Sequence, residues 1–279
     1  MQLFDTHSHY NLDPIYSNYI TLMQQAQHIG ITKSMVVGTD FHTSQKAIEL
    51  KQAHPDFFLA SIGLHPSNIN EEIVANSQAP NSITNLVNNI TNLMSTSEFD
   101  AYGELGLDFF RLDKKQPVFE KIMTAQLDVL RQQLRFIVNQ PKAVIIHVRD
   151  DFCQPEDHLN AYHLILKTIH EEKAQNLKTI FHCFSGNQAY LAQVLTLPQS
   201  YISFAGNLTF KSAHQLRQCF VQVPVNRLLL ETDSPFLSPE PKRGQYCQPS
   251  FLKWTAEYSS KQLNADLLQI YQNSIGIFS

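Results

Sequence analysis

Eight short apolar segments are distributed along the chain, and they constrain its fold more than any other feature. Their apolar and β-branched residues follow one another without polar alternation, which is typical of strands buried on both faces of a parallel sheet. Helical periods separate them, and this alternation predicts an α/β fold, a closed (β/α)8 barrel. We place the strand segments at residues 3–9, 33–37, 57–62, 100–103, 143–146, 178–181, 201–204 and 227–232.

Apolar residues recur at helical spacing between the strand segments. The stretch from Ala75 to Ser97 is rich in Asn, Ser and Thr, yet apolar residues recur at the same spacing from Ile83 to Met94. We therefore expect the third barrel helix here, preceded by a surface loop. The other predicted helices lie within residues 15–29, 47–53, 119–138, 159–169, 189–197, 216–220, 252–263 and 265–275.

The length and composition of the chain are compatible with one domain. It has 279 residues, of which 43% are hydrophobic, and barrels of about 250 residues fold as single domains. We therefore expect one domain over residues 1–279. No segment approaches the roughly 18 apolar residues of a membrane span, and the four cysteines lack C-x-x-C spacing. We expect a cytoplasmic monomer that does not bind membranes.

Six residues with metal-binding side chains stand at the ends of these apolar segments. A single buried histidine is more often a hydrogen-bonded core residue than a ligand. Recurrence at strand ends changes this balance, because α/β barrels place their chemistry at the carboxyl ends of the strands. The six candidates are His7, His9, Glu104, His147, His182 and Asp233.

Six ligands exceed what one tetrahedral zinc site takes from a protein. We therefore predict two divalent ions that share ligands. A carboxylate can bridge two cations and an imidazole cannot, so Glu104 is the predicted bridge. Mixed imidazole and carboxylate ligands suit Zn, Mn, Mg or similar ions and do not select among them. One ion would be held by His7, His9 and Asp233, and the other by His147 and His182 together with Glu104.

Two cations about 3.5 to 4 Å apart form hydroxide from water near neutral pH and stabilise both oxygens of a phosphoryl displacement. The predicted activity is therefore phosphoester hydrolysis, with Glu104 and Asp233 as catalytic carboxylates. Asp233 is placed to take the proton from the attacking water. Substrate contacts are predicted for four residues that follow strand segments, some of them placed to bind phosphate: His65, Arg149, Lys211 and Arg243.

Several neighbouring residues have two possible interpretations. Asp5, Asp108 and Asp150 are interpreted as partners that orient histidines or as loop caps rather than as ligands. For His65, a turn residue before proline is as plausible as a substrate contact. Four aromatic residues could stack on bases, but packing at the barrel rim explains them equally well. These four are Tyr10, Phe109, Phe110 and Phe210.

Taken together, segments spread over nearly the whole chain resemble the TatD family of metal-dependent deoxyribonucleases, which belongs to the amidohydrolase-like barrels. The resemblance implies a (β/α)8 barrel, two divalent metals at the six positions, and hydrolysis of DNA phosphodiesters, often by exonuclease trimming. Val148 and residues 245–247 depart from the family pattern. The matching segments are residues 5–9, 63–66, 103–108, 147–150, 182–186 and 231–235.

The same metals could instead activate a carbonyl, which gives an amide or ester hydrolase such as a lactonase or an aminoacyl-tRNA deacylase. A non-catalytic, metal-bound interaction protein is a third alternative. The net charge of -4 gives no general attraction to polyanions. Any DNA contact is therefore expected to be local, weak and independent of sequence, at single strands or strand ends.

Overall fold

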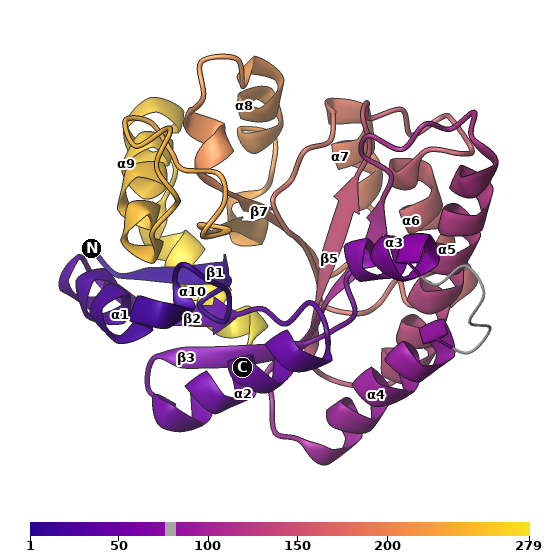
Figure 1. The fold of residues 1–279 in the computed structure, drawn as a ribbon. Coiled ribbons are helices and arrows are strands. Elements are labelled where there is room, and N and C mark those ends of the chain that lie inside the picture. The colour runs from indigo at the N-terminus through magenta and orange to yellow at the C-terminus, as the bar shows by residue number, and fades with distance from the viewer. Residues whose placement is uncertain (76–81) are drawn as a thin grey trace.

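Eight parallel strands, hydrogen-bonded in chain order, form the centre of the computed structural model, which describes residues 1–75 and 82–279 (Figure 1). The last strand returns to the first, because Ser8 pairs with Ser234 and the His9 nitrogen donates to the Ser234 oxygen at 2.8 Å. The predicted (β/α)8 barrel is thereby confirmed. The strands are β1 (Leu3–Ser8), β2 (Ile31–Val36), β3 (Phe58–Ile62), β4 (Ala101–Asp108), β5 (Ala143–Arg149), β6 (Thr179–Phe181), β7 (Ser200–Phe204) and β8 (Leu228–Leu230).

Helices surround the strands (Figure 1). Short 3-10 turns precede α1, follow β7, and precede β8 and α9. The helices are α1 (Tyr19–His28), α2 (Phe41–Ala53), α3 (Pro66–Ala75), α4 (Ser82–Thr96), α5 (Pro117–Ile137), α6 (Ala161–Glu171), α7 (Gln188–Val194), α8 (His214–Phe220), α9 (Leu252–Leu263) and α10 (Leu267–Ile277).

Two helices differ most from the sequence prediction, while the bounds of several others shift by a few residues. Helix α2 begins at Phe41, not at residue 47, because Asp40 caps it by accepting a hydrogen bond from the Thr43 nitrogen at 2.7 Å. Helix α3 was not predicted, although Pro66 at its first position is a common helix start. Helix α4 confirms the predicted third barrel helix, whereas the loop expected before it falls on residues 76–81, outside the described residues.

The hydrophobic core fills the amino end of the barrel and leaves polar side chains at the carboxyl end. One buried cluster combines residues of β1, β2, β3, β4, β5, β6 and β8 with Ile277 of α10. Phe4, Ala101 and Ala143, near the starts of their strands, belong to it. The amino end of the barrel is therefore filled, and polar side chains gather at the carboxyl end. Among the described helices, none has the length and apolar character needed to span a bilayer.

Candidate metal centre

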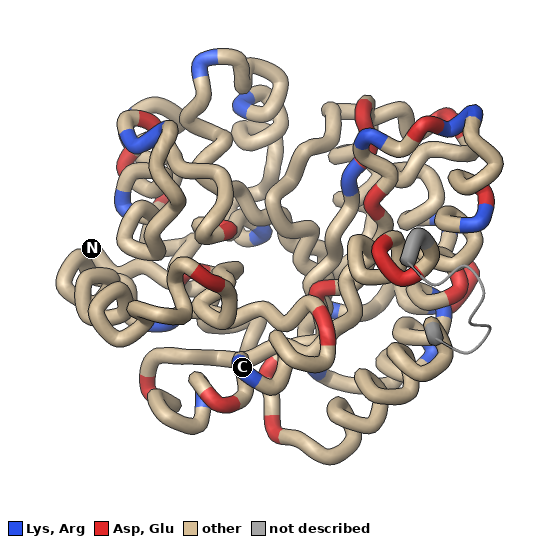
Figure 2. Tube along the Cα trace, viewed as in Figure 1, with Lys and Arg blue, Asp and Glu red and all other residues tan. Residues whose placement is uncertain are grey.

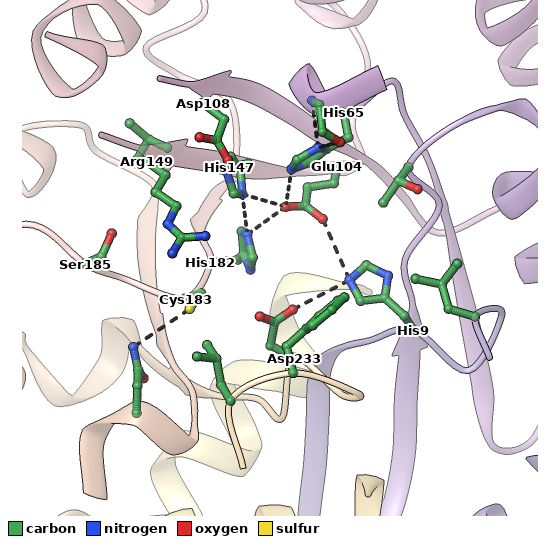
Figure 3. A pocket seen from close by; sticks show the side chains of 17 residues that line it. His9, His65, Glu104, Asp108, His147, Arg149, His182, Cys183, Ser185 and Asp233 are labelled. Carbon is green, nitrogen blue, oxygen red and sulfur yellow. Dashed lines mark hydrogen bonds and ion pairs between the residues drawn. The ribbon is translucent and has the colours of Figure 1, made fainter. Parts of the chain in front are cut away.

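The six predicted ligands converge at the carboxyl ends of the strands, around one carboxylate. Figure 3 labels five of them, His9, Glu104, His147, His182 and Asp233. His7 and Glu104 lie within β1 and β4, and His147 lies within β5. His9, His182 and Asp233 follow the ends of β1, β6 and β8. All of these side chains are buried apart from a partly exposed His147.

The two oxygens of Glu104 face different histidines. Oε2 lies 3.3 Å from His7 Nε2 and 4.0 Å from His9 Nε2. Oε1 lies 2.9 Å from His147 Nδ1 and 2.7 Å from His182 Nε2. One carboxylate therefore joins two groups of nitrogen ligands, which is the arrangement a bridging ligand requires.

Asp233 belongs to the first of these groups. Its Oδ1 lies 3.6 Å from His9 Nε2 and 3.7 Å from His7 Nε2. His7, His9 and Asp233 offer three ligand atoms that all lie within 4.8 Å of one another. These three residues form a compact set of donors that could hold a metal ion.

The hydrogen bond of His9 shows why a cation fits this group. His9 Nδ1 lies 3.1 Å from the Val37 carbonyl oxygen, which can only accept, so Nδ1 carries the proton. In the neutral ring, Nε2 then directs its lone pair toward Asp233 and Glu104, which are also acceptors. Acceptors that face one another need a cation between them, either a proton or a metal ion.

The second group repeats this pattern. His147 Nε2 lies 3.0 Å from an oxygen of Asp108, and His182 Nδ1 lies 3.3 Å from an oxygen of Glu231. Because carboxylates accept from these nitrogens, the opposite nitrogen of each ring is left to face Glu104. Histidines that bind metals commonly have such a carboxylate partner on the other nitrogen. The geometry of both groups therefore fits divalent metal ions.

The electrostatics of the centre also favour bound cations. Burial alone would raise the pKa of Glu104, but the charges of His182, His65 and His7 hold it well below its usual value. Burial would lower the pKa of His182, yet Glu104 and Glu231 raise it well above its usual value. A carboxylate that stays ionised in a buried site attracts positive charge, and protons and metal ions compete for it.

His65 lies closer to this centre than the sequence indicated. Its Nε2 is 3.4 Å from Glu104 Oε1, while Nδ1 contacts the Ser67 hydroxyl at 2.7 Å. His65, Glu104 and His147 form another set of ligand atoms within 4.8 Å. Burial lowers the pKa of His65, which favours its neutral form. His65 is therefore a ligand-capable residue, whereas the sequence analysis considered it as a substrate contact or as a turn residue before proline.

Asp5, Asp108 and Asp150, which the sequence analysis interpreted as partners that orient histidines or as loop caps, contact a histidine or a loop. Asp108 faces His147, and the Asp5 carboxylate accepts hydrogen bonds from both the backbone nitrogen and the hydroxyl of Thr232. Asp150 accepts from the Ala161 nitrogen at the start of α6, at 3.0 Å. Glu231 was missed because it precedes Asp233 in the same apolar segment, and only the fold shows that it faces His182.

Close backbone packing brings β4 and β5 together at the centre. At Gly106 of β4, φ is 153°, and an added Cβ would collide with the carbonyl oxygen of His147. Two ligand-bearing loops also contain strained residues, since Cys183 and Asp233 have φ values of 42° and 53°. Such conformations persist where the surrounding structure fixes them, and they are frequent at functional sites.

A cavity of about 620 Å³ opens above the centre. Arg149 lines it, and its guanidinium group points into it toward His182 and Cys183 (Figure 3). The same guanidinium group stacks on the Phe110 ring, 3.7 Å from the ring centroid. Of the predicted substrate contacts, His65 and Arg149 line the cavity, while Lys211 and Arg243 are exposed and are not among the described lining residues.

The aromatic residues considered from the sequence are not free to stack on bases. Tyr10 and Phe109 are fully buried. Arg149 covers Phe110, and Arg243 stacks on Phe210 at 4.0 Å from its ring centroid. For Tyr10 and Phe109, the packing interpretation was therefore the right one. Phe236, which the sequence analysis did not consider, lines the cavity and is 52% exposed.

Comparison with known proteins connects this centre to a family. The sequence model of the family described as TatD related DNase matches residues 4–278. The uncharacterized metal-dependent hydrolase YabD of Bacillus subtilis is 32% identical over 258 residues, which cover 91% of this chain and 89% of YabD. A second such hydrolase, BU355 of Buchnera aphidicola, is 31% identical over 265 residues, which cover 93% of this chain and 91% of BU355.

Solved structures show the same fold. The TatD homologue YjjV of Escherichia coli superimposes with a TM-score of 0.79 at 21% identity, over 99% of this chain and 97% of YjjV. A TatD family hydrolase of Entamoeba histolytica gives 0.77 at 18% identity, over 100% of this chain and 98% of that structure. From the match along nearly its whole length, we conclude that the chain belongs to the TatD family of metal-dependent hydrolases.

Proposed function

We propose that this hydrolase cleaves DNA phosphodiester bonds, at unpaired strand ends, with two divalent ions held by the six ligands and bridged by Glu104. When bound, such ions supply hydroxide from water near neutral pH and stabilise charge on phosphoryl oxygens. The division of the Glu104 oxygens between two groups of histidines supports two ion positions. The ions could be Zn, Mn or Mg.

The position of the Arg149 side chain favours a phosphate substrate over a neutral carbonyl substrate. Its guanidinium group points into the cavity beside the centre, and within the described part of the chain it forms no salt bridge with a carboxylate. Phe110 restrains the group by stacking, so little side-chain entropy is lost on binding. A planar guanidinium with free donors matches two oxygens of a phosphate.

Asp233 is proposed to accept the proton of the attacking water. Burial would raise the pKa of Asp233, but the hydrogen bond with His9 and the neighbouring imidazoles lower it. The Asp233 carboxylate is therefore ionised and can accept a proton. His65 is proposed to contact the substrate from the opposite side of Glu104. Lys211 and Arg243 would contact a longer DNA strand outside the cavity.

The shape and charge of the molecule support strand ends over duplex DNA. The ligands are buried beneath a cavity of about 620 Å³, a volume in the range that encloses a single small ligand. Figure 2 shows acidic and basic residues interspersed along the described chain rather than gathered into one basic face. Recognition would therefore depend on contacts inside the cavity. We further propose that the protein acts as a monomer in the cytoplasm.

A substrate panel with Arg149 variants tests this function. The wild-type protein, supplied with Mn, should cleave single-stranded DNA and show little activity on lactones and carboxylic esters. Arg149→Gln should lower kcat/KM for DNA by about 10- to 100-fold, because one charge-assisted contact is lost. Arg131→Gln, on the outer surface of α5, is the matched control. Hydrolysis of lactones or esters in preference to DNA would contradict the proposal.

A further inference from the structure

Phe236 presents an open aromatic surface to the metal centre. It lines the cavity, yet 52% of it is exposed to solvent. Its neighbour Leu237 also lines the cavity and widens this apolar wall. A half-exposed phenyl ring that lines a cavity leaves much of its apolar area in contact with water, so it is accessible to an apolar or aromatic part of a ligand.

The position of Phe236 is fixed relative to the ligands. Its backbone nitrogen donates to the carbonyl oxygen of Asp233 at 2.8 Å, and the nitrogen of buried Cys247 donates to the Pro235 oxygen at 2.8 Å. The ring lies edge-to-face with His9, with 6.0 Å between centroids and 73° between planes. The Phe236 ring is therefore held directly beside His9, a candidate metal ligand.

By contrast, the aromatic ring beside Arg149 does not offer such a surface. Phe110 is already covered by Arg149, so that the pair presents a cation. Among the described residues, no Lys or Arg stacks on Phe236. The cavity thus has a cationic wall at Arg149 and an open aromatic wall at Phe236. A nucleotide has the matching parts, a phosphate and a flat base joined by a sugar.

We infer that Phe236 is a specificity-determining residue that stacks against the unpaired base of the terminal nucleotide, whose phosphodiester lies at the metal centre. This inference rests on the proposed function and deepens it, since it makes the base part of the recognised substrate. Stacking on an aromatic ring tolerates any base, because every base has a π face. The enzyme would then require a base at the strand end without selecting its identity.

The test compares two single-stranded oligonucleotides that differ only in whether the terminal nucleotide at the cleaved end carries a base or is abasic. Wild-type protein should prefer the base by about 5- to 150-fold in kcat/KM, the range expected for one base–aromatic stack. Phe236→Ala should lose this preference by cleaving the base-containing strand more slowly while leaving the abasic strand unaffected. Phe236→Trp should retain the preference.

Phe152→Ala is the matched control, because Phe152 is 74% exposed but is not among the described cavity-lining residues. It should retain the wild-type preference. A binding readout is independent of turnover: fluorescence of 2-aminopurine at the strand end should be quenched by wild-type protein and by Phe236→Trp, and less by Phe236→Ala.

Three outcomes separate the possibilities. Equal cleavage of both strands by the wild-type protein would overturn the role of Phe236 and leave the nuclease function intact. Equal losses on both strands in Phe236→Ala would show a structural role and would also overturn it. No cleavage of either strand by metal-loaded wild-type protein would overturn the proposed function, and the stacking inference with it.

Discussion

Asp5 holds Thr232 through two hydrogen bonds, accepting from its backbone nitrogen at 2.8 Å and from its hydroxyl at 2.6 Å. Asp5 lies in β1, and Thr232 immediately precedes Asp233, so this pair fixes a ligand-bearing loop to the strand that carries His7. Both partners are buried. Burial raises the pKa of Asp5 to about 8, which makes the pair sensitive to pH.

Replacing Asp5 with Asn should flatten the pH dependence of stability. Between the ordinary pKa of 3.8 and the raised value of about 8, the folded protein keeps a proton on Asp5 that the unfolded chain releases. Asp5 therefore makes the free energy of unfolding fall as pH rises through this window, by up to about 1.4 kcal/mol per pH unit. Asn does not titrate and would not contribute to this fall.

Denaturant unfolding at pH 5, 6, 7 and 8 measures the effect of Asp5→Asn. Asp128→Asn is the control, because the Asp128 side chain is 60% exposed on α5. The control should keep the wild-type slope. A slope in Asp5→Asn equal to that of the wild-type protein would show that Asp5 is already ionised in the folded state near neutral pH.

Asp233→Asn should remove most of the activity without unfolding the protein. An amide neither binds a cation as well nor accepts a proton, and loss of a general base typically costs about 10²- to 10⁴-fold in rate. Asp108→Asn should have a smaller effect, about 10- to 100-fold, because Asp108 acts through His147. Steady-state kinetics with single-stranded DNA would rank the two, and wild-type rates in Asp233→Asn would exclude the assigned role.

Metal affinity should increase with pH. Burial disfavours protonation of His9, His147 and His182, but the neighbouring carboxylates raise the pKa of all three, so protons occupy the positions that metal ions need. Each proton displaced on binding strengthens the apparent affinity by up to about tenfold per pH unit below the pKa. Calorimetric titration with Mn at pH 6 and pH 8 should show tighter binding at pH 8. An identical Kd at both values would contradict this.

Gly106→Ala should destabilise the protein where β4 meets β5. The added Cβ would collide with the His147 carbonyl oxygen, a backbone atom that cannot move without disturbing a ligand. We expect a loss of at least about 2 kcal/mol in the free energy of unfolding. Gly276→Ala, in α10 with open space around it, should instead stabilise by about 0.5 to 1 kcal/mol. Similar unfolding midpoints for both variants would contradict the close packing.

The barrel and the six ligand candidates could be predicted from the sequence because both depend on local patterns. Uninterrupted apolar segments mark strands of a parallel sheet, and their carboxyl ends must lie at the same end of the barrel. The side chains that follow these segments were therefore expected to meet, and the structure brings His7 and Asp233 to 3.7 Å of each other.

Other parts of the centre depend on three-dimensional packing. Glu231 and His182 come from different strand segments, and only the closed barrel places them 3.3 Å apart. His65 approaches Glu104 because its backbone nitrogen donates to the Thr39 oxygen at 2.8 Å, a contact between two loops. The exposure of Phe236 likewise depends on how its loop folds over the centre. No periodicity in the sequence contains this information.

The most direct test of the account is hydrolysis of end-labelled single-stranded DNA by metal-stripped protein resupplied with Mg, Mn or Zn. We predict no cleavage without metal, a ladder that shortens from one end when metal returns, and loss of both the ladder and the second bound ion in Glu104→Gln. Wild-type protein that binds two ions yet leaves the DNA intact with every metal would contradict the account and direct attention to carbonyl substrates.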